Sequence, residues 1–148
     1  MTLIGRTIGN FRIIELIGEG GMGEVYVGYD DRLHRKVALK AIRGEKRFDE
    51  RAKTRLLREA EILSKLEHPN ICRLYDFIET EDADVLVLEL IKGKSLNKVK
   101  IEELSRSEKL RIAVQIGEVL SDAHARSVVH RDLTPENVMI DDRDQVKV

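Results

Sequence analysis

Apolar residues in the first half of the chain fall in short runs rich in β-branched and aromatic side chains, a pattern typical of β-strands. Residues 11–17 and 24–29 flank a glycine-rich stretch and predict an antiparallel hairpin. A third strand is predicted over residues 35–42, and two more over 71–79 and 84–90, separated by the acidic turn TEDA. The first half therefore predicts a five-stranded antiparallel sheet.

One stretch among these strands has the period of a helix. From about Asp49 to Leu66, charged residues are interspersed with an apolar stripe at helical spacing. The stripe consists of Ala52, Leu56, Ala60 and Leu63. The residues His68-Pro69-Asn70 follow, and a proline ends a helix. We therefore predict one amphipathic helix between the third and fourth strands.

The second half is predicted to be mainly helical. Residues 92–95 (KGKS) have the composition of a linker. Ser105 and Glu108 can form a capping box, in which each side chain accepts a hydrogen bond from the other residue's backbone N–H, before a long helix. One face of that helix is expected to carry Leu110, Ala113, Ile116, Leu120 and Ala123. The turn DDRD before the final QVKV predicts a β-hairpin, so the fold class is α+β.

Composition narrows the classes of protein that fit the chain. Its 148 residues, 42% of them hydrophobic, can bury a core as one domain or two small lobes. The net charge of −1 offers no general attraction to nucleic acid or to an anionic membrane. The single cysteine, Cys72, lies in an apolar run and suits a buried thiol in a reducing compartment. No stretch approaches the roughly 18 apolar residues of a membrane span, so we expect a cytoplasmic protein.

The glycines between the first two strands form a motif that can bind phosphate. Gly18, Gly20 and Gly23 fit the spacing G-x-G-x-x-G, and Val25 extends it. Glycine lets the backbone approach phosphates where a Cβ would collide. The motif alone is weak evidence for phosphate binding, because the same glycines could simply form a loose hairpin. A dinucleotide fingerprint requires a helix directly after the glycines, whereas EVYVGY is rich in strand formers, so we favour a flap between two strands.

Two charged residues occupy positions that are expected to be apolar. Lys40 follows Val-Ala-Leu in the third strand and shares a face with Ala38, and Glu59 lies on the helix stripe beside Leu56 and Leu63. Lys40 could reach solvent from the strand end, and Glu59 could pair with Arg55 on the surface. A contact between Lys40 and Glu59 explains both charges at once, and it would hold the ammonium ready for a polyphosphate.

Residues 130–137 (HRDLTPEN) combine an acid and an amide in one tight loop. Asp132 could accept a hydroxyl proton, and Asn137 could bind a metal ion, a division of labour that suits phosphoryl transfer. Such residues are also ordinary loop formers. The glycines, Lys40 and their order along the chain favour the catalytic interpretation.

These motifs, in this order from about residue 11 onward, resemble the eukaryotic-type (Hanks-type) protein serine/threonine kinases, and GEGGMGEVY resembles their bacterial branch. The resemblance implies that Lys40 contacts the α and β phosphates of ATP and that Glu59 positions Lys40. It also implies that Asp132 orients and deprotonates the substrate hydroxyl while Asn137 holds Mg²⁺. The residues implied to bind ATP are Ile17, Gly18, Glu19, Gly20, Gly21, Met22, Gly23, Val25, Ala38, Lys40, Leu88, Glu89, Ile91 and Met139.

The resemblance further assigns parts of the adenine pocket and of the domain. It implies that the ring lies between Val25, Ala38 and Met139, and that the backbone of the hinge, from about residue 89, hydrogen-bonds it. Leu88 corresponds to the residue at the rear of the pocket, and Arg131 to one that pairs with a phosphate on the activation loop. Residues 1–91 would then form the N-terminal lobe and 92–148 part of a mainly helical C-terminal lobe.

The chain departs from the family pattern in two ways. Thr134 occupies the position where the family usually has a lysine that helps neutralise the transferring phosphate. The final QVKV stands about where Asp-Phe-Gly would begin, so the principal magnesium ligand, the activation loop and most of the C-terminal lobe are absent from the sequence. We therefore expect the isolated chain to be inactive. We also expect the long helix to expose an apolar face that favours self-association.

The predicted function is transfer of the γ-phosphate of ATP to serine or threonine hydroxyls of a protein substrate in a complete version of the domain. The alternative is a non-catalytic, pseudokinase-like module that binds nucleotide or regulates a partner. Thr134 and the end of the sequence before Asp-Phe-Gly both favour it. A small-molecule phosphotransferase of related fold is a third hypothesis. It is less well supported, because HRDLTPEN lacks the His-Gly-Asp form typical of those enzymes.

Overall fold

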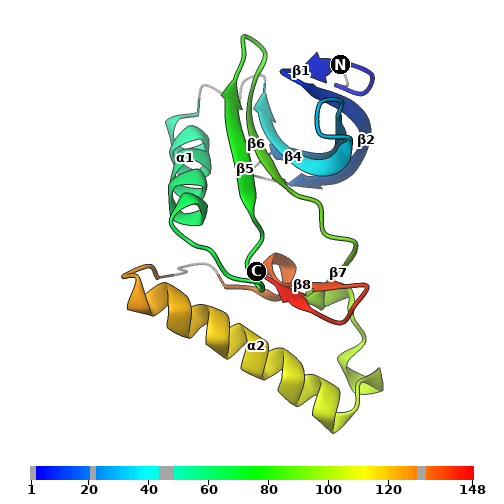
Figure 1. Ribbon diagram of the computed structural model, residues 1–148, viewed down its shortest axis with the longest axis vertical. Helices are drawn as coiled ribbons and strands as arrows, with labels where there is room; N and C mark the ends of the chain where they lie inside the picture. The colour runs from blue at the N-terminus through cyan, green and yellow to red at the C-terminus, as the bar shows by residue number, and fades with distance from the viewer. Residues whose placement is uncertain (1–2, 21–22, 44–48, 130–132) are drawn as a thin grey trace. The chain divides into compact units, whose positions relative to one another are not determined.

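The computed structural model (Figure 1) divides into two compact units, Met1–Ser64 with Arg73–Leu90 and Lys65–Cys72 with Ile91–Val148. Each unit has its own sheet. The structure describes residues 3–20, 23–43, 49–129 and 133–148.

The first unit is built on an antiparallel sheet with the strand order β1-β2-β3-β4-β6-β5. The strands are β1 (Thr7–Ile8), β2 (Phe11–Gly20), β3 (Gly23–Asp30), β4 (Arg35–Arg43), β5 (Leu74–Glu79) and β6 (Ala83–Glu89). The predicted hairpin and third strand are confirmed. The predicted number of five strands is wrong, because Thr7 and Ile8 add an edge strand against Arg12 and Phe11. A strand of two residues is too short to show alternation in the sequence.

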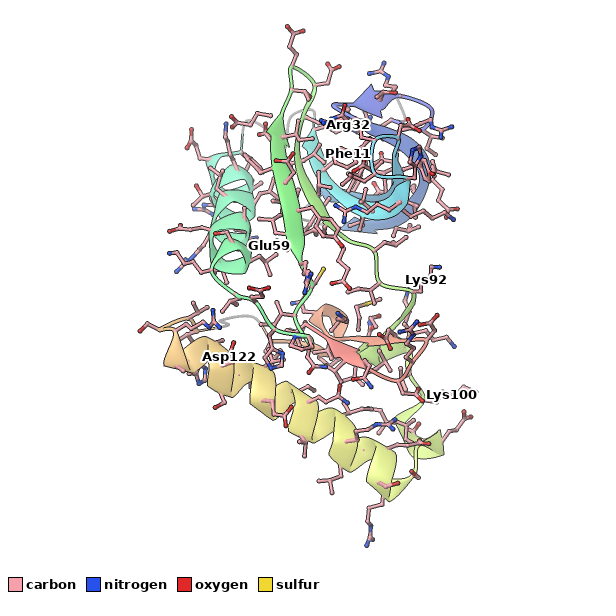
Figure 2. The ribbon with its side chains drawn as sticks, viewed as in Figure 1. Phe11, Arg32, Glu59, Lys92, Lys100 and Asp122 are labelled. Carbon is pink, nitrogen blue, oxygen red and sulfur yellow. The ribbon has the colours of Figure 1, made fainter. Side chains whose placement is uncertain are left out.

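The main core of the first unit lies on one face of this curled sheet (Figure 1). Successive side chains of a strand point to opposite faces, so Val37, Leu39 and Ala41 of β4 all enter the core, where each is at most 1% exposed. Tyr26 of β3 joins them there, as does Phe11 of β2, which lies within the curl (Figure 2). The residues that alternate with these in β4, Ala38 and Lys40 among them, therefore face the opposite side.

A single helix, α1 (Glu50–Ser64), lies beside β5 and β6 in the first unit (Figure 1). Its predicted range and apolar stripe are confirmed, because Ala52 and Leu56 are buried and Ala60 and Leu63 are half-buried. Lys53 of α1 also reaches Glu79 and Asp84 of the sheet, at 3.6 and 3.9 Å. The helix is thus fixed to the sheet by apolar packing and by charge.

The second unit contains the long helix α2 (Arg106–Ala125) and a small sheet of β7 (Gly93–Ser95), β8 (Met139–Asp141) and β9 (Val146–Lys147). Its described residues also include three short 3₁₀ segments: η2 (Leu96–Lys98), η3 (Ile101–Glu103) and η4 (Pro135–Asn137). The predicted capping box of α2 is confirmed, and so is the terminal hairpin of β8 and β9. The linker predicted over residues 92–95 is wrong, because Gly93–Ser95 pairs with β8.

The buried face of α2 agrees only in part with the predicted one, because Ala123 is buried and Ile116 packs against the core of this unit, whereas other predicted residues are exposed. Leu110 is 63% exposed and Ala113 is exposed, whereas Ile112 is buried and packs with Val138 and Val146. The buried residues of α2 are Ile112, Gln115, Val119 and Ala123. Apolar residues occur on more than one side of this helix, so the position of the small sheet decides which stripe is covered.

A buried polar network joins residues 65–72 to the rest of the second unit. The Asn70 side-chain amide donates to Oε1 of Gln115 and to the carbonyl of Val146, both at 2.8 Å. The backbone N–H of Val148 donates a hydrogen bond to the carbonyl of Asn70 at 2.9 Å, and the N–H of Cys72 donates to the carbonyl of Val148 at 3.0 Å. The strand predicted over 71–79 therefore begins only at Leu74, and Cys72 is half-buried rather than buried.

None of the helices in the described ranges combines the length and the apolar character that crossing a membrane requires.

Candidate functional site

The site begins with Lys40 on β4, whose side chain leaves the sheet on the face opposite the main core. Neighbouring strands place Val25 of β3 and Leu86 of β6 directly beside it. The Lys40 side chain is 22% exposed. An ammonium at such a position requires an anionic partner or water, because burying a charge without compensation is costly.

Glu59 of α1 supplies that partner. The Lys40 Nζ donates to Oε2 of Glu59 at 2.8 Å, and the glutamate side chain is 31% exposed. Figure 2 shows Glu59 on α1 within the first unit. The predicted contact is therefore present, in place of a lysine that reaches solvent alone. Partly exposed ion pairs contribute only about 1 kcal/mol or less to stability, so the effect of this pair is mainly to place the ammonium.

An apolar surface borders the Lys40 ammonium on the same face of the sheet. Strand register aligns Val27, Ala38 and Leu88 in the row next to that of Val25 and Lys40. Ala38 and Val25 are half-buried, whereas Leu88 is buried. Such a surface suits a ligand that joins an apolar ring to an anionic group, because small-molecule sites combine apolar walls with a few polar groups.

The glycine-rich hairpin lies at one end of that surface. Gly18 pairs with Val25 and Gly20 with Gly23 across the hairpin. Gly23 has a φ of +132°, and a Cβ there would lie 2.2 Å from the carbonyl oxygen of Ala41, so no other residue fits without a shift. Ile17 stands at the register shift before Gly18 and is 51% exposed.

Some predicted residues cannot be placed at this surface. Asp132 lies outside the described residues, as do Gly21 and Met22. Ile91, Asn137 and Met139 belong to the second unit, where Met139 is half-buried on β8 and Asn137 is the exposed last residue of η4.

Comparison with known proteins gives these residues a family. Residues 11–148 match the family model of the protein kinase domain. The chain belongs to the protein kinase domain family. It is 40% identical over 144 residues to the serine/threonine-protein kinase pkn3 of Myxococcus xanthus, a match that covers 95% of this chain and 26% of that protein.

Other relatives are similar to this kinase domain over nearly all of its sequence. The serine/threonine-protein kinase PrkC of Bacillus subtilis is 38% identical over 149 residues, which cover 99% of this chain and 23% of PrkC. PknA of Mycobacterium tuberculosis is 37% identical over 147 residues, which cover 95% of this chain and 34% of PknA. The chain thus spans between 23% and 34% of the length of these three relatives.

Glu89, where the sequence predicts the hinge to begin, is the last residue of β6. Its N–H donates to the carbonyl of Arg73 at 2.9 Å, and its Oε2 accepts from the N–H of Arg73 at 3.2 Å. The backbone N–H of Glu89 is thus engaged within the first unit. A ligand that bonds to the Glu89 backbone would have to use its carbonyl oxygen.

The sequence reasoning missed a polar cluster on the reverse face of the sheet of this kinase domain. The Tyr26 hydroxyl donates to Oε2 of Glu24 at 2.5 Å, and Arg43 binds the same carboxylate with two nitrogens, at 2.9 and 3.2 Å. Burial raises the pKa of the Tyr26 hydroxyl, and the hydrogen bond and charge of Glu24 raise it further. Glu24 and Arg43 occupy strand positions that face the core, which is the signal that could have revealed them.

Proposed function

We propose that the protein containing this chain is a serine/threonine kinase and that its first unit contributes to ATP binding. The observation that carries the proposal is the contact of Lys40 with Glu59 beside an apolar surface and a glycine-rich hairpin. In protein kinases a strand lysine held by a helix glutamate binds the nucleotide phosphates. The names of the relatives support serine and threonine as acceptors.

We assign the parts of ATP to residues as membership of the kinase family implies. The Lys40 ammonium would bind the α and β phosphates, and the backbone after Gly18 would approach the phosphates closely. The adenine ring would contact Val25 and Ala38, which share one face of the sheet of the first unit. Within the first unit, the carbonyl oxygen of Glu89 would accept a hydrogen bond from the ring.

Phosphoryl transfer would follow from positioning and charge stabilisation. The oxygen of a serine or threonine hydroxyl attacks the γ-phosphorus, the bond to the bridging oxygen breaks, and ADP leaves. Asp132 takes the hydroxyl proton, and Lys40 stabilises charge on the phosphates.

Mg²⁺ is the ion that the family implies for this reaction, and it would neutralise phosphate charge. Asn137 would hold it through the side-chain amide oxygen. That oxygen fits the ion, because Mg²⁺ prefers oxygen ligands and retains several waters beside one or two protein groups. The exposed position of Asn137 leaves space for those waters.

A non-catalytic nucleotide-binding module is the second candidate function. Thr134, half-buried at the N-cap of η4, offers a neutral hydroxyl where the family usually has a lysine. A hydroxyl can hydrogen-bond a phosphate but cannot neutralise it, so weaker catalysis is expected with nucleotide binding retained. Protein substrates, cytoplasmic location and self-association remain predictions from the sequence.

Titration of the 148-residue chain with ATP and Mg²⁺ in a calorimeter tests the proposal. We expect binding by the unaltered chain and an affinity at least about tenfold lower in Lys40→Met, because a charge-assisted hydrogen bond to phosphate is lost. The matched control is Lys36→Met, an exposed lysine of the same strand that should leave the affinity unchanged. Equal affinities of the Lys40 and Lys36 variants would remove the basis of the proposal.

A further inference from the structure

Glu24, Tyr26 and Arg43 form a cluster whose geometry is more specific than packing alone requires. Arg43 binds the Glu24 carboxylate through both Nε and an Nη atom, and Tyr26 donates to one oxygen of that carboxylate. The Glu24 and Arg43 side chains are 19% and 25% exposed, and Tyr26 is 1% exposed. Two-point contacts between arginine and a carboxylate fix direction as well as distance.

The cluster lies on the sheet face opposite Lys40. Glu24 and Tyr26 flank Val25 on β3, so their side chains point away from the face that Val25 shares with Lys40. Glu24 pairs with Ala41 of β4, and Arg43 is two positions further along the same face. The cluster therefore links the first residues of β3, directly after the glycines, to Arg43 at the end of β4, three residues after Lys40.

The backbone at Gly23 allows little variation in the distance between β3 and β4. At Gly23 the hairpin passes so close to β4 that a Cβ would lie 2.2 Å from the carbonyl oxygen of Ala41. The next residue is Glu24, which is bound by Arg43. The close approach and the ion pair thus act on consecutive residues and bring the base of the glycine hairpin to the Lys40 strand.

We propose that Glu24, Tyr26 and Arg43 are positioning residues that fix the base of the glycine hairpin relative to Lys40 and thereby set the affinity for nucleotide. The proposal rests on the proposed function. An apolar cluster would stabilise the fold at least as well, but it would not fix the orientation of the start of β3 relative to β4. The Tyr26 hydroxyl donates its proton to one oxygen of Glu24, which adds a second fixed direction to the ion pair with Arg43.

The test compares variants of the 148-residue chain by hydrogen exchange and by ATP titration. Arg43→Met should speed amide exchange at residues 17–20 and 23–27 without speeding it in β5 and β6, and should weaken ATP binding about fivefold or more. The double variant Glu24→Arg with Arg43→Glu swaps the two charges. It should largely restore both slow amide exchange at these residues and the affinity for ATP. Arg12→Met is the matched control, because Arg12 pairs with Asp31 at 3.2 Å near the other end of the same hairpin.

A second variant keeps the test decisive if Arg43→Met does not fold. Tyr26→Phe retains the buried ring and removes only the hydroxyl, so it should show the same local change in exchange to a smaller degree. Exchange that rises uniformly through the first unit, or only in Arg12→Met, would overturn the proposal and leave a purely structural ion pair.

The two proposals fail in different ways. If the unaltered chain binds no ATP, the proposed function fails, whereas exchange at the hairpin still shows whether the cluster fixes it. If ATP binds and Arg43→Met speeds local exchange with unchanged affinity, the cluster holds the hairpin but does not set affinity, and the inference is wrong.

Discussion

Lys40 and Glu59 show how a single contact can resolve two unfavourable placements. Each residue carries charge at a position that strand or helix periodicity assigns to an apolar face, and the structure joins them at 2.8 Å. Because such partly exposed pairs add little stability, their arrangement is better explained by what the ammonium can bind. The sequence predicted this contact because both positions conflict with the periodicity of their elements.

Asp132 is the residue on which phosphoryl transfer should depend most. In a longer polypeptide that completes the kinase domain, Asp132→Asn removes the carboxylate that we propose as acceptor of the hydroxyl proton but retains similar size and polarity. We expect the transfer rate to fall by about 10²-fold or more, with the affinity for ATP nearly unchanged, as measured by phosphate incorporation into protein and by calorimetry. An unchanged rate would contradict the role of Asp132 as the base.

Helices and strands differ in how well the sequence predicted them. The long helix has a local start signal, and the structure shows its capping box at Ser105 and Glu108, with both hydrogen bonds at 3.1 Å. The strands β1 and β7 contain two and three residues, too few for alternation to show. Gly93 resembles a linker residue, yet it meets Asp141 far along the chain, a pairing that no local pattern encodes.

The capping box of α2 should contribute measurably to stability. Ser105→Ala removes the side-chain oxygen that accepts from the N–H of Glu108, so we expect unfolding free energy to fall by about 1 kcal/mol. Urea unfolding followed by circular dichroism measures the change. Ser121→Ala, an exposed serine within the same helix, is the control and should change stability by no more than about 0.5 kcal/mol.

The whole chain combines two units, each with its own sheet and core. The contact of Lys40 with Glu59 in the first unit was predictable, because each of these charges stands out from a regular apolar pattern. The buried partnership of Asn70 with Gln115 was not predictable, because the two residues are 45 positions apart and belong to different elements. Membership of the protein kinase family rests on nearly the whole chain, residues 11–148.

The central claim is that Glu59 acts on nucleotide through Lys40, and a double-mutant cycle on ATP affinity tests it most directly. Calorimetric titrations of the unaltered chain, Lys40→Met, Glu59→Gln and the double variant provide the four affinities. We predict that Glu59→Gln weakens binding about threefold to tenfold and that the double variant binds no more weakly than Lys40→Met alone, because interacting residues are not additive. Additive losses, or no loss in Glu59→Gln, would contradict the account.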